Sequence, residues 1–323
     1  MDFFDNQQAN LLATRLEVRH LRDVLIFPQY FQLETVYACN SRCTMCSINW
    51  DNGKSAKLNV QLFDKFVDEV KEYSNWVKAI CLQGAGEPTL DTQLPERVKR
   101  LKDAGIKKVY FSTNGQLLNQ ELTQKLINSG LDDLRISFDA ITPEIYKKIR
   151  PNLNFETVMT NALNAIQLRD AINPKMVIRM RLVILDENKH EVPKWLAFWE
   201  NKLSEHDLAE AVPSHTFGNQ WKAESDESIS QFADKPCLSL FSTMILDSDG
   251  IAGLCCADCN GKYNMGDFSR QTIKEIWNGE MFAKFREYHL TSQRNCIDMC
   301  RGCHIWDRTE KSILEHGTKE EIV

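Results

Sequence analysis

The chain has 323 residues, 43% of them hydrophobic and 26% charged, and a net charge of −6, which is typical of a globular protein and excludes the basic footprint of a nucleic-acid-binding protein. No apolar run approaches the roughly 20 residues of a membrane span, and the amino terminus lacks the basic and apolar regions of a signal peptide. We therefore expect a cytoplasmic protein that binds neither nucleic acid nor membrane.

The first 32 residues are expected to form an arm or helix outside the core, because Pro28 breaks any helix before the first strand. Strand-like and helix-like segments then alternate. The expected strands are 33–38, 77–82, 107–112, 133–138, 176–185 and 207–213, and the expected helices are 58–74, 95–104, 119–129, 142–171 (one helix or a pair) and 190–202. Crossover helices imply parallel strands. Six β/α units are too few to close an eightfold barrel, so we expect an α/β fold, an open partial (β/α)6 barrel.

Three cysteines follow the first expected strand with the spacing C-x3-C-x2-C: Cys39, Cys43 and Cys46. Thiolates suit iron–sulfur clusters or zinc, and three ligands on one short loop leave one metal position open to something other than protein. This favours a reactive site over a structural one. A zinc knuckle with a remote fourth ligand, or three buried thiols, would show the same pattern.

The second expected strand ends in a turn with the sequence QGAGEP, from Gln83 to Pro88. Its two glycines allow a ligand to approach the backbone closely, and the carboxylate after them can accept hydrogen bonds from an ammonium or hydroxyl group. By itself, the pattern also fits a glycine turn without chemistry.

Together the two motifs resemble those of the radical S-adenosylmethionine (SAM) family, over residues 33–215. In that family three cysteines hold a [4Fe–4S] cluster, and the amino and carboxylate groups of SAM chelate its fourth iron. The turn resembles the family's GGEP turn, which holds the SAM amino group, with Ala85 where the first glycine often stands. The resemblance implies a cluster on Cys39, Cys43 and Cys46, and SAM contacts from Met45, Gly84, Gly86, Glu87, Pro88, Ser112, Asn114, Ser137, Asp139 and Arg150.

Alternation along the expected strand 176–185 separates an apolar even face from an odd face that carries Arg179 and Arg181. If the apolar face packs under helices, both arginines point into the barrel, where a SAM carboxylate or a polar substrate can neutralise them. The alternative is an odd face at an exposed edge. His215, at the end of the last expected strand, is a further candidate for substrate contact, although a single histidine is more often an ordinary surface or core residue.

Residues 216–235 are polar, rich in serine and acidic residues, and without periodicity, so we expect a linker there. A hairpin is expected from 243–246 into 251–255, followed by a helix over 272–288. Seven of the eleven cysteines lie between Cys237 and Cys303. In a reducing compartment this argues for metal ligation rather than disulfides.

The order of these elements resembles the SPASM cap of radical SAM proteins, or its single-cluster form called twitch, with a cap over 236–310 and a charged tail over 311–323. The resemblance implies a second [4Fe–4S] cluster on Cys237, Cys255, Cys300 and Cys303. A structural zinc on four cysteines is the alternative. Three further cysteines have no ligand role in this pattern: Cys256, Cys259 and Cys296.

The resemblance also implies an enzyme that reductively cleaves SAM to methionine and a 5′-deoxyadenosyl radical, which takes hydrogen from a substrate. The electron would come from a flavodoxin- or ferredoxin-type donor. A non-catalytic electron-transfer or redox-sensing protein is the competing class, but it does not account for the glycine turn. Only 32 residues precede the first expected strand, too few for a leader-peptide domain, so we expect a small polar substrate such as a sugar or aminocyclitol.

Oxidation of an alcohol carbon, assisted by the auxiliary cluster, is the expected reaction. One alternative is an epimerase in which Cys256 returns hydrogen, since adjacent residues of an extended segment point to opposite sides and Cys255 is an expected ligand. The other alternative is an enzyme that modifies ribosomal peptides.

Overall fold

The computed structural model describes residues 3–50, 56–214, 217–218, 220, 235–301 and 303. The chain divides into two compact units. The barrel unit comprises residues 33–46 and 50–214, and the cap unit comprises residues 1–32, 47–49 and 215–323. None of the described helices is long and apolar enough to cross a membrane.

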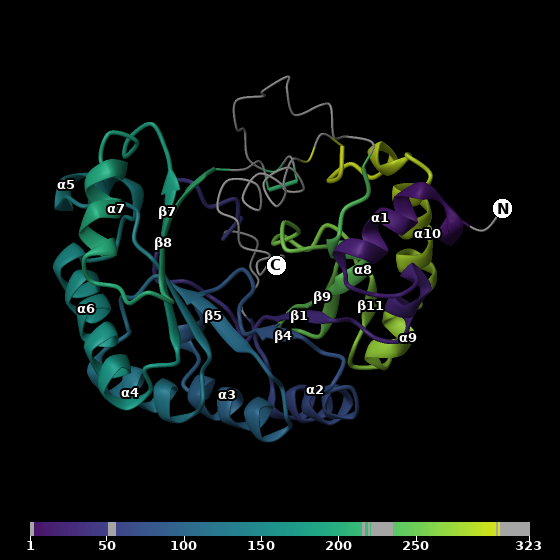
Figure 1. The fold of residues 1–323 in the computed structure, drawn as a ribbon, viewed down its shortest axis with the longest axis horizontal. Helices are drawn as coiled ribbons and strands as arrows, with labels where there is room; N and C mark the ends of the chain where they lie inside the picture. Colours follow the sequence, from purple (N-terminus) through teal and green to yellow (C-terminus); the bar gives the residue numbers. More distant parts are fainter. Residues whose placement is uncertain are drawn as a thin grey trace. The chain divides into compact units, whose positions relative to one another are not determined.

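The barrel unit contains a run of parallel strands with helices along their outer side (Figure 1). Strands β4 (Ala79–Cys81), β5 (Val109–Thr113), β6 (Asp133–Ser137), β7 (Val177–Ile184) and β8 (Leu208–Pro213) pair in parallel in chain order. The helices are α2 (Val60–Glu72), α3 (Leu94–Asp103), α4 (Gln120–Asn128), α5 (Pro143–Ile149), α6 (Phe155–Ile172) and α7 (Val192–Glu200), with a short 3-10 helix, η3 (Pro88–Leu90). This alternation confirms the expected fold class.

The first expected strand is not continuous. Strand β1 (Tyr30–Leu33) ends where it was expected to begin, and β2 (Val36–Tyr37) pairs antiparallel with β3 (Ala56–Lys57). The interruption lies at the buried Glu34, whose carboxylate accepts a hydrogen bond from the Ala85 N–H at 2.7 Å. This polar contact ties the break in the strand to the glycine turn.

Strand β7 shows the alternation that the sequence predicts. Ile178, Met180 and Leu182 are buried, whereas Arg179 and Arg181 are half-buried. The parallel register places Arg179 beside Arg135 and Arg181 beside Ser137 on β6. Because alternate residues of a strand share a face, the polar face of β7 continues across β6.

The cap unit combines the first and last parts of the chain. Its elements are η1 (Phe3–Asp5), α1 (Gln7–Arg15), η2 (Leu21–Leu25), β1, α8 (Ser239–Ser242), β9 (Thr243–Leu246), β10 (Ile251–Gly253), β11 (Gly266–Asp267), α9 (Ile273–Trp277), α10 (Glu280–Leu290) and η5 (Arg294–Cys296). Strands β9 and β10 form the expected hairpin, with Leu246 opposite Ala252. The expected helix over 272–288 is instead two helices. They separate at Gly279, which begins α10 and where a Cβ atom would lie 3.1 Å from the Ile276 carbonyl oxygen.

The amino-terminal segment shares the core of the cap unit. Trp277 Nε1 donates to the Val24 carbonyl at 2.7 Å, and Asn6 Nδ2 donates to the Leu290 carbonyl at 2.7 Å. Leu12 and Val24 are fully buried. The first and last parts of the chain therefore fold together.

A buried ion pair in the barrel unit joins α6 to the residue that precedes β8. Arg169 Nη2 lies 2.5 Å from Asp207 Oδ2, and neither side chain is exposed. Asp207 also accepts hydrogen bonds from Ile178 N–H at 2.7 Å and Ser204 Oγ at 2.6 Å. Burial acts to raise the pKa of Asp207, but the hydrogen bonds from Arg169, Ser204 and the backbone hold this pKa below its ordinary value.

Replacing Asp207 with alanine should lower the free energy of unfolding by about 3–5 kcal/mol, because Arg169 would remain buried without its partner. The matched control is Asp170→Ala. Asp170 contacts the same arginine at 2.8 Å, but its side chain is 56% exposed, so we expect a loss of about 1 kcal/mol or less. Denaturant unfolding measures both changes, and equal losses would contradict this assignment.

The same pair predicts a pH dependence. Since the folded pKa of Asp207 is lowered, its contribution to stability is complete above its unfolded pKa of about 4 and is lost as the pH falls through the folded pKa. The difference in unfolding free energy between the wild type and Asp207→Ala should therefore shrink in acid.

Candidate functional site

The cysteine loop follows β2 and is anchored to the end of α5. Thr44 N–H donates to the Ile149 carbonyl at 3.0 Å, and Ser41 Oγ donates to the Pro151 carbonyl at 3.0 Å. Ser41 also contacts two of the thiols, with its N–H 3.4 Å from Cys39 Sγ and its Oγ 3.3 Å from Cys43 Sγ. These contacts hold the loop, and the Ser41 N–H provides a hydrogen-bond donor to the Cys39 sulfur.

The glycine turn lies directly against the strand that leads to this loop. Glu87 N–H donates to the Ala38 carbonyl at 2.8 Å. A Cβ atom on Gly86 would stand 1.9 Å from the Val36 carbonyl oxygen and 2.8 Å from that of Ala38. Only glycine fits this close backbone approach.

The Glu87 carboxylate is buried, and both of its oxygens accept hydrogen bonds from the protein. Oε1 accepts hydrogen bonds from Thr89 N–H at 3.1 Å, Thr89 Oγ1 at 2.6 Å and Thr113 Oγ1 at 2.6 Å. Oε2 accepts from the Asn114 N–H at 2.7 Å. Asn114 Nδ2 in turn donates to Asn40 Oδ1 at 2.7 Å. Glu87 therefore joins the turn to the end of β5 and, through Asn114, to the cysteine loop, a role that sequence reasoning missed.

A cavity of about 120 Å³ lies beside the loop and the turn. Its lining residues are Cys39, Cys43, Gln83, Gly86, Glu87, Ser112, Thr113, Asn114, Ser137 and Arg150. All but two of these residues were candidates from the sequence. The two missed are Gln83, whose Oε1 accepts a hydrogen bond from Ser112 N–H at 3.0 Å, and Thr113. Gln83 begins the QGAGEP turn, so its position was a usable signal.

Other expected residues of this site lie outside the cavity wall. Met45 and Pro88 are buried, and Gly84 packs against the Glu34 side chain. Asp139 is fully buried, where it accepts hydrogen bonds from the Val183 N–H at 2.7 Å and from Arg150 Nε. Arg150 Nη1 lies 3.6 Å from Cys43 Sγ. Asp139 therefore orients Arg150 rather than lining the cavity itself.

The thiols suit a cationic metal centre. Burial raises the pKa of Cys39 to about 11, against the lowering effect of the Ser41 N–H, while Glu87, Cys43 and Cys46 raise it further. A thiolate at this position therefore requires a nearby cation, such as cluster iron. In the described part of the chain, no three metal-binding side chains already surround a common point.

The barrel arginines form ion pairs on the polar face of the strands. Arg179 Nε lies 3.0 Å from Asp133 Oδ2, and Arg181 Nη2 lies 2.8 Å from Glu210 Oε2. The side chains of Arg179 and Arg181 are 13% and 34% exposed, so neither stands at a fully exposed edge. Arg135 also contacts Asp133, and its guanidinium lies 4.1 Å from the centre of the Tyr110 ring. The substrate role of the arginines stays a prediction, and His215 lies outside the described residues.

The four expected cap ligands lie close to one another. Burial raises the pKa of Cys255 well above its ordinary value, and neighbouring thiols raise it further: Cys256, Cys300, Cys303 and Cys237. Burial and Cys237 also raise the pKa of Cys300. Cys256 and Cys296 are exposed, and Cys259 is half-buried, with its Sγ 3.2 Å from Ser47 Oγ. These four thiols therefore lie near enough in the cap to influence one another electrostatically.

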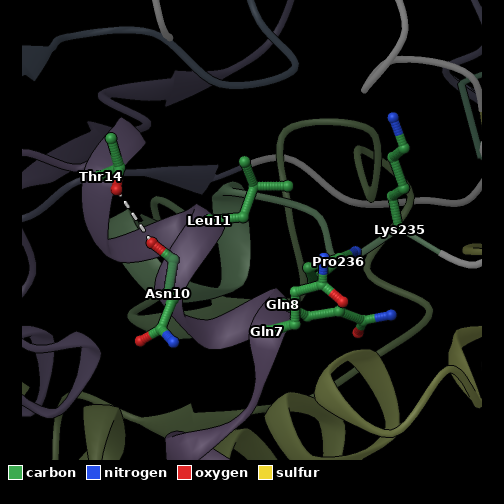
Figure 2. Close-up of a pocket in the computed structure, with 7 residues that line it drawn as sticks. All are labelled: Gln7, Gln8, Asn10, Leu11, Thr14, Lys235 and Pro236. Carbon is green, nitrogen blue, oxygen red and sulfur yellow. Dashed lines mark hydrogen bonds between the residues drawn. The ribbon is translucent and has the colours of Figure 1, made fainter.

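A second cavity, of about 480 Å³, lies on α1 in the cap unit (Figure 2). Figure 2 shows that the lining side chains come from α1 (Gln7, Gln8, Asn10, Leu11 and Thr14) and from the segment at Lys235 and Pro236. None of its lining residues is a cysteine, histidine or carboxylate. We assign no chemistry to it.

Two family models match the chain: the radical SAM superfamily over residues 33–198, and an iron–sulfur cluster-binding domain, SPASM, over residues 237–304. The chain belongs to the radical SAM superfamily. The first match contains the cysteine loop, the glycine turn and strands β4 to β7, and the second contains all seven cap cysteines. This radical SAM enzyme uses SAM and a [4Fe–4S] cluster, and its cap binds iron–sulfur in addition.

Curated relatives match part of the chain. A probable GTP 3′,8-cyclase from Methanococcus maripaludis is 35% identical over 154 residues, which is 47% of this chain and 49% of the relative. Another, from Sulfolobus acidocaldarius, is 36% identical over 118 residues, which is 36% of each chain. The chain thus spans about half the length, or less, of these relatives.

Solved structures share the fold over most of the chain. BtrN in complex with AdoMet and 2-DOIA is 16% identical with a TM-score of 0.57, covering 85% of this chain and 92% of BtrN. Streptococcus suis SuiB bound to the precursor peptide SuiA is 14% identical with a TM-score of 0.65, covering 87% of this chain and 71% of SuiB. Both support the partial barrel with a carboxyl-terminal cap.

Gly86→Ala should weaken SAM binding by at least about tenfold in Kd, or ~1.4 kcal/mol, because the added Cβ displaces the turn from the strand before the cysteine loop. The matched control is Ala85→Gly in the same turn, for which we expect a change of about twofold or less, since it adds no atoms. Calorimetric titration of the reconstituted protein with SAM measures both. Unchanged affinity in Gly86→Ala would show that the close approach is dispensable.

Proposed function

We propose that the chain cleaves SAM at a cluster held by Cys39, Cys43 and Cys46, and oxidises an alcohol carbon of a small polar substrate. When bound, SAM and the cluster supply a 5′-deoxyadenosyl radical that removes one hydrogen atom from the substrate. Loss of a proton and of one electron then leaves a carbonyl group. The observation that carries this proposal is the match of residues 237–304 to an iron–sulfur cluster-binding domain, within which the thiols of Cys237, Cys255, Cys300 and Cys303 influence one another electrostatically. We propose these four thiols as the ligands of a cluster that accepts the electron.

Arg150 is the proposed cation of the reactive site. Its Nη1 lies 3.6 Å from Cys43 Sγ, and the guanidinium also lines the cavity. A guanidinium favours the thiolate form of a neighbouring cysteine and binds carboxylates well. We assign to Arg150 the stabilisation of the Cys43 thiolate and contact with the SAM carboxylate, with Asp139 as its positioning residue.

Glu87 is the proposed contact of the SAM ammonium group. Its Oε1 is occupied by three donors, whereas Oε2 accepts only the Asn114 N–H among the described residues. Each carboxylate oxygen has two lone pairs, which three donors share on Oε1, whereas one described donor uses those of Oε2. Oε2 therefore has capacity for an ammonium donor in the cavity that Glu87 lines.

A small polar substrate is supported by the match to BtrN, whose bound ligand is 2-DOIA and whose chain is covered to 92%. The match to SuiB, bound to its precursor peptide SuiA, has the higher TM-score, 0.65 against 0.57, and covers 71% of that chain, so the peptide alternative also has support. GTP belongs in any substrate panel, since the matched curated relatives are named GTP 3′,8-cyclases. A flavodoxin- or ferredoxin-type protein is the proposed electron donor.

An epimerase is the second candidate, because Cys256 lies beside Cys255 and its thiol is exposed. In that reaction a thiol returns a hydrogen atom to the opposite face of the substrate carbon. The Cys256 thiol is also close to Cys237, Cys303 and Cys259, so a role within the cap fits it as well.

Replacing Cys39, Cys43 and Cys46 together with alanine should leave about half of the reconstituted iron, from about eight to about four per chain, because the auxiliary cluster stays. Production of 5′-deoxyadenosine with dithionite should be abolished. Iron analysis and chromatography of the reaction measure these outcomes, with Cys81→Ala as a control for loss of a barrel thiol outside the site. SAM cleavage by the triple variant would show that the reactive cluster lies elsewhere.

Reaction in deuterium oxide separates oxidation from epimerisation once a substrate is found. Oxidation should give a carbonyl product two hydrogens lighter than the substrate, whereas a thiol donor would place one solvent deuterium on an inverted carbon. Cys256→Ala should leave an oxidation intact. Loss of an inverted, deuterated product in this variant, with SAM cleavage retained, would favour the epimerase.

A further inference from the structure

Arg294 joins two of the segments that carry the proposed auxiliary ligands. Its guanidinium donates to the Cys300 carbonyl from Nε at 3.2 Å and from Nη2 at 3.1 Å, and Nη2 also donates to the Cys303 carbonyl at 2.7 Å. Nη1 donates to the Lys235 carbonyl at 2.9 Å, two residues before Cys237. One side chain thus fixes the Cys300–Cys303 turn and the segment that leads to Cys237.

The positive charge of Arg294 is buried. The residue is 2% exposed, and its hydrogen-bond partners are neutral carbonyl groups. Among the residues that the structure describes, the carbonyls of Lys235, Cys300 and Cys303 accept its hydrogen bonds. Since a guanidinium stays charged at any relevant pH and a buried charge is costly without an anion, a nearby anion would stabilise Arg294 in this position.

The neighbouring His289 does not share this charge. Its Nδ1 accepts a hydrogen bond from the Cys237 N–H at 3.0 Å, and the ring is fully buried. A ring nitrogen that accepts a hydrogen bond carries no proton, so this imidazole is neutral. His289 therefore positions Cys237, and Arg294 is the charged group of the pair.

We infer that Arg294 is the fixed counter-charge of the auxiliary cluster. This inference rests on the proposed ligands Cys237, Cys255, Cys300 and Cys303. Four thiolates around a [4Fe–4S] core carry a net negative charge that grows by one on reduction, so a nearby cation stabilises the reduced form. Arg294 thereby raises the reduction potential of this cluster, which favours transfer of an electron from the substrate radical.

The test uses the full chain with Cys39, Cys43 and Cys46 changed to alanine, reconstituted with iron and sulfide, so that only the auxiliary cluster is present. Arg294→Gln removes the charge, and Arg294→Lys keeps it without the planar fork. A redox titration followed by the electron paramagnetic resonance of the reduced cluster compares them. At one fixed potential the ratio of reduced to oxidised cluster should fall about tenfold in Arg294→Gln, or about 59 mV. It should change by about twofold or less in Arg294→Lys, because the charge is retained.

If Arg294→Gln failed to load iron while Arg294→Lys loaded normally, this would also support a role for the positive charge of Arg294. An unchanged midpoint in Arg294→Gln, or equal effects of both variants on midpoint or loading, would overturn it. If the parent protein with Arg294 holds no cluster, the proposed ligand set is wrong and this inference falls with it. The two failures are therefore distinguishable.

Arg286 provides the matched control. It is also buried in the cap unit, at 1% exposure, and donates to the carbonyls of Leu240 at 2.9 Å and Trp277 at 2.8 Å. These partners belong to α8 and α9 rather than to a proposed ligand. Arg286→Gln should leave the midpoint of the auxiliary cluster unchanged. If Arg286→Gln shifted the midpoint potential as much as Arg294→Gln does, the cause would be a general loosening of the cap. That result would overturn the inference.

Discussion

The Glu87 carboxylate is the group on which the site of the barrel unit depends. It is 4% exposed, and its donors come from the glycine turn and from the end of β5. Asn114 extends the connection to Asn40 in the cysteine loop. A buried carboxylate is stable only while such donors satisfy it. The turn, the strand end and the loop therefore hold one another in position, and the cavity between them keeps its shape.

Two buried arginines accompany the two sets of cysteines, and their charges are balanced differently. Arg150 faces Cys43 through Nη1 and pairs with Asp139 through Nε, so a carboxylate offsets part of its charge. Among the described residues, the groups that accept hydrogen bonds from Arg294 are the carbonyls of Lys235, Cys300 and Cys303. Net charge near a cluster is one of the factors that set its potential. The contrast suits the tasks that we propose, in which the reactive cluster gives an electron to SAM and the auxiliary cluster receives one.

The sequence could predict the parts of the site that depend on local spacing. The C-x3-C-x2-C and QGAGEP motifs are local, and alternation along strands placed Ser112, Ser137 and the two β7 arginines on the cavity or polar face. It could not predict that Thr113, one position out of phase with Ser112, would donate to Glu87.

Other features required the tertiary structure. The position of Arg294 depends on the Lys235 carbonyl, 59 positions away in the sequence, and no local sequence pattern predicts this contact. The break in the first strand likewise depends on Glu34 meeting Ala85, 51 positions later. By contrast, the split of the helix over 272–288 had a local signal in Asn278-Gly279, because glycine disfavours a helix interior.

The most direct test of two clusters with different tasks is the electron paramagnetic resonance of the reduced protein with and without SAM. In the full chain with Cys237, Cys255, Cys300 and Cys303 changed to alanine, we predict one cluster whose signal changes when SAM is added, because SAM binds its open iron. A signal there that is insensitive to SAM would contradict the assignment of Cys39, Cys43 and Cys46 to the reactive cluster.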